Sequence, residues 1–425
     1  MTDSVEIAFT CDSATSCTAF DVRTSTRLIA YRDGGILGPK TLNITNNRYV
    51  VAGESNKPLL RIWRINSQEP APVKYILPGC PNSLAVSPDG NYSAVGIKHK
   101  FFIYGMLTGA KMATLAYHYG ELVALKFTDD GSHLISAASD CRIAVWNVAR
   151  LIQGKEEDAR LYQFTDSMLP ITDIYVGKGG MRALLGATSL DRSCTLYNLA
   201  SGTLLLKLVY PNPLSVLTLN SLETELFVGD RKGAIYVCDL RSLPRQTEIH
   251  ITPEALSVNT LHGHQKSVTC LSVSVDNETL LSGGDDGLVV LWHIPTRQQL
   301  KVLPHKGPVT NAFFFSNPRL MFDQSFTNSV PFPPLLKDDN SLKNQGREEV
   351  VVEHSVAQSA GPLKSDHLPV VGDMSEKLEA VSECSAVEDY PNELLKLRKE
   401  VDHLKKINKM MFDHIVDKLQ LFEEE

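Results

Sequence analysis

The sequence predicts an all-β fold: a seven-bladed β-propeller, followed by a disordered linker and a C-terminal coiled-coil helix. Three observations support this prediction. Short apolar or β-branched runs recur between clusters of Gly, Asn, Asp and Pro through residues 1–316. A pattern of His, Ser, Asp and Trp occurs twice with the same spacing. Beyond residue 316 the composition becomes polar, until a helical pattern begins near residue 391.

The repeated pattern predicts a buried hydrogen-bond chain within a blade. In both copies the Ser lies four residues before the Asp, and the Asp lies six residues before the Trp. An imidazole placed between a carboxylate and a hydroxyl, with an indole N–H donating onward, satisfies every polar group of the set. The two predicted tetrads are His118, Ser136, Asp140 and Trp146, and His264, Ser282, Asp286 and Trp292. We expect them to be structural and not a catalytic Asp-His-Ser arrangement.

These motifs resemble the WD40 repeat, whose blade is a four-stranded sheet of roughly 40–45 residues. The resemblance is carried by Gly263-His264, the alternating strand that follows, and the Asp and Trp at the stated spacing. Six units are expected, and in the fourth Asp191 precedes Tyr197 by the same six residues. The six units span residues 38–77, 82–115, 118–165, 170–208, 214–241 and 264–303.

A seventh blade is expected from both ends of the propeller. The N-terminal runs 5–10, 17–22 and 27–31 supply three strands, one short of a blade. Residues 309–315 supply the fourth and close the ring, which removes exposed sheet edges. The insert 242–262 is predicted to be a surface excursion, either a variable loop or a partner-binding loop.

Composition limits the function classes. The 425 residues carry a net charge of −7, so no global attraction to nucleic acid is expected. The eight Cys form no metal-ligand pattern, and several fall in apolar strands, which suits reduced thiols. No phosphate-binding Gly-rich motif, signal peptide or membrane span is predicted. We therefore expect no cofactor, no metal, no catalytic residue and no membrane association.

The remaining segments are predicted to be a linker and a helix. Residues 317–390 are expected to be a disordered, acidic and Pro-containing linker, in which 330–336 either docks on a surface or serves as a passive spacer. Residues 391–425 form a helix whose heptad pattern predicts a parallel homodimeric coiled coil, although an amphipathic helix that packs on another protein has the same stripe. The predicted seam residues are Leu394, Leu397, Val401, Leu404, Asn408, Met411 and Ile415.

The opening segment Met-Thr-Asp-Ser-Val-Glu-Ile and the closing segment around Leu397–Ile415 resemble the family of WD-repeat subunits of the rixosome, a nuclear assembly. The resemblance implies a non-catalytic scaffold in the nucleus (nucleolus and nucleoplasm, with a cytoplasmic pool left open). The implied process is maturation of the large ribosomal subunit and removal of the internal spacer from its rRNA precursor. It also implies several partners: a large helical-repeat scaffold subunit, a HEAT-like testis-expressed subunit, an endonuclease with its polynucleotide kinase, a SUMO protease and the pre-ribosomal particle.

Two questions stay open at this point. The overall charge leaves undecided whether contact with RNA is direct or indirect. A generic peptide- or modification-reading propeller adaptor is the alternative function, which requires an aromatic cage or an Arg cluster at the channel. An enzyme with its site in the channel requires convergent titratable residues there.

Overall fold

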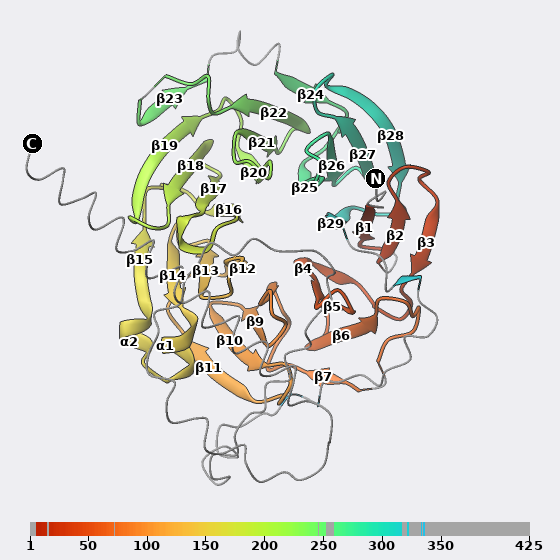
Figure 1. The fold of residues 1–425 in the computed structure, drawn as a ribbon, viewed down its shortest axis with the longest axis vertical. Helices are drawn as coiled ribbons and strands as arrows, with labels where there is room; N and C mark the ends of the chain where they lie inside the picture. Colours follow the sequence, from red (N-terminus) through yellow and green to blue (C-terminus); the bar gives the residue numbers. More distant parts are fainter. Residues whose placement is uncertain are drawn as a thin grey trace, which may run out of the picture. The chain divides into compact units, whose positions relative to one another are not determined.

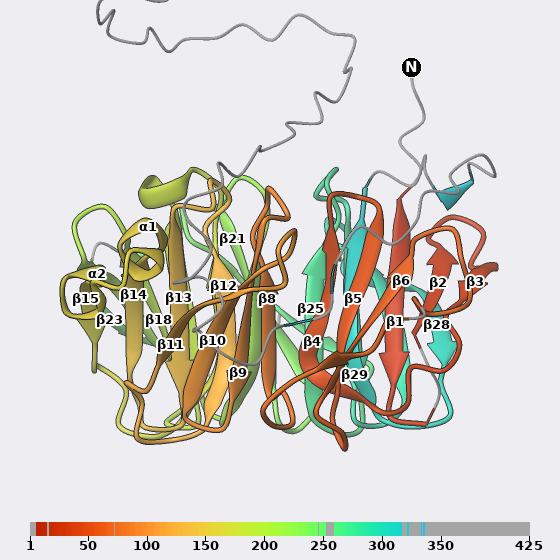
Figure 2. The same cartoon turned by 90° about the horizontal axis from the view of Figure 1, so that it is seen from below.

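The structure is a computed structural model that describes residues 6–14, 17–71, 73–244, 246–251 and 259–316, together with 321, 322, 333 and 335. Within these residues seven sheets, antiparallel except for one added strand in the fourth blade, surround a central channel, which confirms the predicted seven-bladed propeller (Figure 1). Seen from the side, the strands run between the two faces of the disc (Figure 2). The predicted linker 317–390, apart from the four residues named above, and the predicted helix 391–425 lie outside the described residues.

Each blade is numbered by its place in the ring, and its strands are given from the channel outward. The first comprises β4 (Leu37–Thr45), β5 (Tyr49–Glu54), β6 (Leu59–Arg64) and β7 (Tyr75–Ile76). The second comprises β8 (Ser83–Val86), β9 (Tyr92–Ile97), β10 (Lys100–Gly105) and β11 (Lys111–Leu115). The third comprises β12 (Leu122–Phe127), β13 (His133–Ala138), β14 (Ile143–Asn147) and β15 (Arg160–Phe164).

The fourth comprises β16 (Ile171–Val176), β17 (Leu184–Ser189), β18 (Ser193–Asn198), β19 (Thr203–Val209) and β23 (Glu248–His250), with a 3-10 turn η1 (Gly180–Arg182). The fifth comprises β20 (Leu214–Leu219), β21 (Glu225–Asp230), β22 (Ala234–Asp239) and β24 (Thr260–His262). The sixth comprises β25 (Val268–Val273), β26 (Thr279–Gly284), β27 (Leu288–His293) and β28 (Gln298–Pro304). The seventh comprises β29 (Val309–Phe315), β1 (Ile7–Asp12), β2 (Thr18–Asp21) and β3 (Arg27–Ala30).

The seventh blade closes the ring as predicted. Strand β29 pairs with β1 in antiparallel register, with Ile7 opposite Phe315 and Phe9 opposite Phe313. The rings of Phe9 and Phe313 stack at 5.7 Å, and Phe315 meets Phe9 edge-on at 5.8 Å. The closing strand is therefore fixed by a backbone ladder and by an aromatic cluster at the same place.

The core is divided among the interfaces between blades. Seven clusters of buried apolar residues each combine side chains from two neighbouring blades. Apolar burial is the main favourable term in folding, so each blade depends on the blade at either side. Removing one blade would uncover two of these clusters.

The prediction that insert 242–262 is a surface excursion is wrong for the residues that form two strands, while residues 245 and 252–258 lie outside the described part of the chain. The last residues of the insert form β24, which is the outer strand of the fifth blade, so that blade extends beyond the predicted end at residue 241. Its strand β23 runs parallel to β19 and adds a fifth strand to the fourth blade. Each of these strands has three residues, too few to show a readable alternation, although Leu261 is buried.

Two short helices that the sequence did not indicate connect β14 to β15 (Figure 1). Helix α1 (Val148–Ile152) begins at Asn147, whose side chain accepts from the backbone N–H of Arg150. Helix α2 spans Glu156–Ala159. Val148 and Leu151 are buried against the core between the second and third blades, so packing holds a helix too short to persist alone.

Candidate functional site: a cationic face and a central channel

Both predicted tetrads are assembled as hydrogen-bond chains. In the third blade His118 Nε2 lies 2.8 Å from Ser136 Oγ, and His118 Nδ1 lies 3.1 Å from Asp140 Oδ2. The indole Nε1 of Trp146 donates to Ser136 Oγ at 2.9 Å. In the sixth blade His264 Nε2 lies 2.8 Å from Ser282 Oγ, and His264 Nδ1 lies 3.1 Å from Asp286 Oδ2. The indole Nε1 of Trp292 donates to Ser282 Oγ at 2.8 Å.

The environment of these chains is that of a scaffold. Ser136 and Ser282 are completely buried, and each hydroxyl already accepts from an indole. Burial lowers the pKa of His118, and this outweighs the opposing effect of Asp140. Burial disfavours the Asp286 carboxylate, but backbone N–H groups of Gln265 and Leu288 together with His264 lower its pKa overall. A neutral imidazole that joins a carboxylate to a hydroxyl satisfies all these groups.

A third hydrogen-bond chain of side chains, in the fifth blade, was not predicted from the sequence. Asp230 Oδ2 accepts from the hydroxyl of Tyr236 at 2.8 Å and from the amide of Asn212 at 2.9 Å. The six-residue spacing from Asp230 to Tyr236 was the available signal. In the fourth blade the same spacing does not join Asp191 to Tyr197, because the hydroxyl of Tyr197 donates to Asp166 instead.

One face of the propeller is cationic. It consists of the turns between the second and third strands of each blade and the loops from each outer strand to the next inner strand. Its exposed acidic residues are only Asp33, Glu121 and Asp166 in the part of the chain that the structure describes. Its exposed basic residues, which define the cationic face, are Arg32, Lys57, Lys98, Lys100, Arg192, Arg231, Lys232, Lys266 and Lys306.

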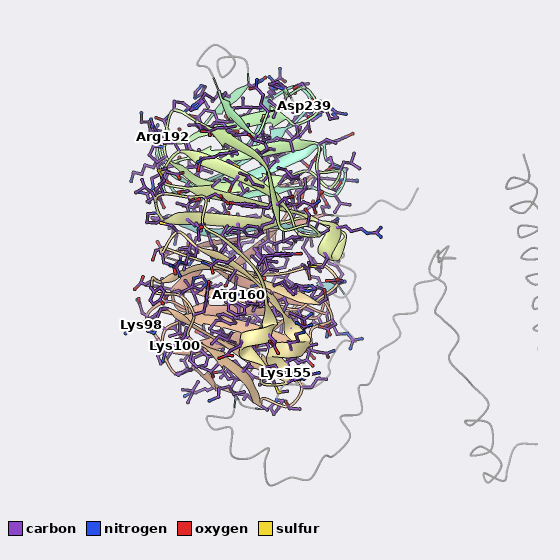
Figure 3. All side chains as sticks on the ribbon, turned by 90° about the vertical axis from the view of Figure 1, so that its left-hand side faces the viewer. Lys98, Lys100, Lys155, Arg160, Arg192 and Asp239 are labelled. Atoms are coloured by element: carbon purple, nitrogen blue, oxygen red, sulfur yellow. The ribbon has the colours of Figure 1, made fainter. Side chains whose placement is uncertain are left out.

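The opposite face carries both signs. Exposed bases such as Lys155, Lys178 and Arg182 are interspersed there with acids such as Asp89 and Asp129. In the side view Lys98, Lys100 and Arg192 lie toward one face, and Lys155 and Asp239 lie toward the other (Figure 3). The faces therefore differ in their exposed charges, although the half-buried carboxylates of Asp140, Asp191, Asp285 and Asp286, in turns of the cationic face, offset part of its positive charge.

Exposed apolar side chains are also present on the cationic face. Tyr119 and Met168 are 84% and 85% exposed, and Leu169 follows Met168 in the same loop. The guanidinium of Arg142 lies 5.3 Å from the ring centre of Tyr119. Large side chains beside cations, on loops that a rigid sheet supports, are typical of a protein contact.

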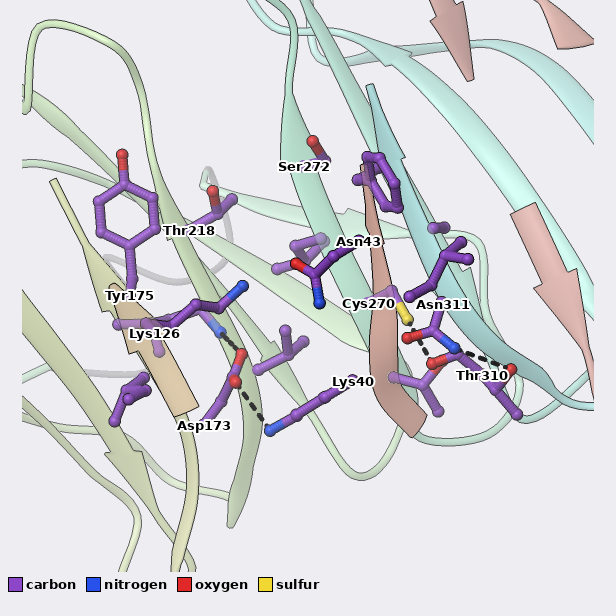
Figure 4. Close-up of a pocket in the computed structure, with 18 of the residues that line it drawn as sticks. Lys40, Asn43, Lys126, Asp173, Tyr175, Thr218, Cys270, Ser272, Thr310 and Asn311 are labelled. Carbon is purple, nitrogen blue, oxygen red and sulfur yellow. Dashed lines mark hydrogen bonds and ion pairs between the residues drawn. The ribbon is translucent and has the colours of Figure 1, made fainter. Parts of the chain in front are cut away.

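The central channel contains a cavity of about 360 Å³, lined by the innermost strands of the blades (Figure 4). Lys40 Nζ lies 2.7 Å from Asp173 Oδ1, and Lys126 enters from the neighbouring strand β12. The aromatic residues that line the cavity are Tyr175 and Phe313, and no Arg lines it within the described chain. The cage or Arg cluster that a modification reader requires is thus not among the described lining residues.

Among the described residues no three His, Cys, Asp or Glu side chains form a cluster that would hold a metal ion. In the same ranges no helix is long and apolar enough to cross a membrane.

Comparisons with known proteins agree with the geometry. Residues 109–147 and 256–293 match the family described as WD domain, G-beta repeat. WD repeat-containing protein 18 of Rattus norvegicus is 31% identical over 96% of each chain. The Homo sapiens protein of that name is also 31% identical, over 96% of each chain. Pre-rRNA-processing protein pro-1 of Caenorhabditis briggsae is 23% identical over 69% of this chain and 57% of its own.

Proposed function

Because the chain belongs to the family of WD repeat-containing protein 18, we propose that it is a non-catalytic scaffold subunit of a rixosome-like nuclear complex. Its role would be maturation of the large ribosomal subunit and processing of the internal spacer of pre-rRNA. The printed name of the nematode relative, a pre-rRNA-processing protein, supports this process. The complete burial of the tetrad hydroxyls supports a role without catalysis.

The observation that carries the proposal is the cationic face. Basic side chains spread over adjoining loops match the spaced phosphates of an RNA backbone. The same face presents Tyr119 and Met168 for a protein partner, for which the helical-repeat scaffold subunit is our first candidate. The HEAT-like subunit, the endonuclease with its kinase and the SUMO protease would then belong to the same assembly, in the nucleolus and nucleoplasm.

A matched pair of triple variants tests the RNA contact. The first changes Lys98, Lys100 and Arg192 to Glu, and the control changes Lys155, Lys178 and Arg182 to Glu, so that the charge change is the same. By fluorescence anisotropy with a structured RNA, the first variant should bind at least about tenfold more weakly, and its salt slope should fall by about one per lost phosphate contact. The control should bind like the unaltered protein. Equal losses in both variants, or no loss in either, would contradict a specific RNA-binding face.

We also propose that helix 391–425 pairs two copies in parallel through the predicted seam, with Asn408 facing Asn408. Such a dimer would present two propellers to one partner and raise avidity. Light scattering of the full chain should give a dimer at tens of micromolar, and a chain ending before Pro391 should give a monomer. A full chain that stays monomeric would refute the homodimer and favour a helix that packs on another subunit.

A further inference from the structure

We propose that the central channel binds a small phosphate-bearing anion at the ammonium of Lys126. The site lies inside the ring and is separate from the cationic face. Anion binding in the channel can therefore be tested independently of RNA binding. Three features of the channel carry it: the neutralised Asp173, the unengaged Lys126 and the polar lining of the cavity.

The charge of Asp173 is already balanced. Its Oδ1 lies 2.7 Å from Lys40 Nζ, and its Oδ2 accepts from the backbone N–H of Leu217 at 3.4 Å. Lys40 also donates to the backbone oxygen of Thr172. Asp173 is buried, and the side chain of Lys40 keeps 23% of its surface exposed, so this pair is partly shielded from water. The pair contributes little net charge to the cavity.

Lys126 carries a positive charge that the ion pair of Lys40 and Asp173 leaves unbalanced. Its ammonium makes no hydrogen bond or ion pair with any residue in the described part of the chain, and it remains exposed to the channel. The surrounding ring partly desolvates this ammonium and so lowers the pKa of Lys126; Asp173 partly offsets this effect, and Lys40 adds to it. A partly desolvated cation without a direct partner gains more from an incoming anion than a lysine on the outer surface would.

The surrounding groups suit a phosphate better than an apolar ligand. Asn43 uses one amide hydrogen on the backbone oxygen of Leu84, at 2.7 Å, and keeps a second. Thr218 makes only a 3.5 Å contact with the oxygen of Leu219, so its hydroxyl is available. Figure 4 shows these side chains and Lys126 around the same space. The tetrahedral oxygens of a phosphate can accept from several such donors at once, and about 360 Å³ is within the range of small-molecule sites.

Titration of the full chain with inorganic pyrophosphate tests the site. Calorimetry at constant ionic strength should show saturable binding, and thermal unfolding should show a midpoint that rises with ligand concentration. Lys126→Met should weaken binding at least about tenfold, and Lys126→Arg should retain most of it. Lys100→Met, which removes a charge from the cationic face, is the matched control and should bind normally. Sodium acetate at the same ionic strength should bind more weakly than pyrophosphate.

Three results would overturn the proposal. One is the absence of saturable pyrophosphate binding. Another is equal binding by the unaltered protein and a Lys126→Met variant that unfolds cooperatively. The third is loss of binding in Lys100→Met with retention in Lys126→Met, which would place the anion on the cationic face. If Lys126→Met does not fold, Lys126→Arg together with Lys126→Gln separates loss of charge from loss of structure.

Discussion

A chain that ends at Pro308 is expected to lose its cooperative unfolding transition. The truncation removes β29, which pairs with β1 along its length and buries Val309, Ala312 and Phe315. Each large buried apolar side chain contributes about 1.5–3 kcal/mol, and total stability is typically about 5–15 kcal/mol. Loss of this strand also opens two clusters and exposes the edge of β1. Urea denaturation followed by tryptophan fluorescence measures the effect.

The control for this truncation is a chain that ends at Phe322. It lacks most of the predicted linker and all of residues 391–425 but keeps β29 and the buried Met321. It should unfold cooperatively, at a urea concentration lowered only slightly by the loss of Leu335, which is half-buried against the core between the first and second blades. If both truncated chains unfold alike with a sharp transition, β29 does not close the ring in the way the register indicates.

Trp292→Ala is expected to lower the free energy of unfolding by about 1–4 kcal/mol. The indole is 3% exposed, packs in the core between the fifth and sixth blades, and donates to Ser282 at 2.8 Å. Its ring also lies against Gly263, where an added Cβ would come within 2.6 Å of it. The substitution therefore leaves a cavity and removes a donor from a buried chain.

Trp292→Phe separates these two causes, because it keeps most of the volume and loses the N–H. It should cost about 1 kcal/mol. RNA binding by either variant, measured at a temperature where it is folded, should match that of the unaltered protein. Full stability combined with lost binding would instead identify Trp292 as part of a binding site.

The sequence predicted the ring well because its signals are local. The spacing of Asp140 to Trp146 and of Asp286 to Trp292 lies within one or two strands, and turn residues separate the apolar runs. Strand β24 and helix α1 were missed because each is short and is held by contacts with distant residues. Short sequence patterns carry no information on contacts between residues that are far apart in the chain.

The candidate sites were less predictable. The cationic face consists of residues that lie between Arg32 and Lys306 in the sequence. The net charge of the whole chain does not reveal this face, because acidic residues elsewhere cancel its positive charge. Lys40, Lys126 and Asp173 come from three blades and meet only when the ring closes. In a propeller the inner strands bring together residues that are far apart in sequence. The charged and polar side chains that line the channel therefore become neighbours only in the closed ring.

Rescue of depleted cells tests the central claim most directly. The protein is depleted in its own cells, and precursor rRNA is measured by hybridisation with a probe for the internal spacer of the large-subunit precursor. Depletion should cause spacer-containing precursor to accumulate. The unaltered protein and the variant with Lys155, Lys178 and Arg182 changed to Glu should restore processing, whereas the variant with Lys98, Lys100 and Arg192 changed to Glu, at equal abundance, should not. Unchanged precursor levels on depletion would contradict the proposed role in spacer processing.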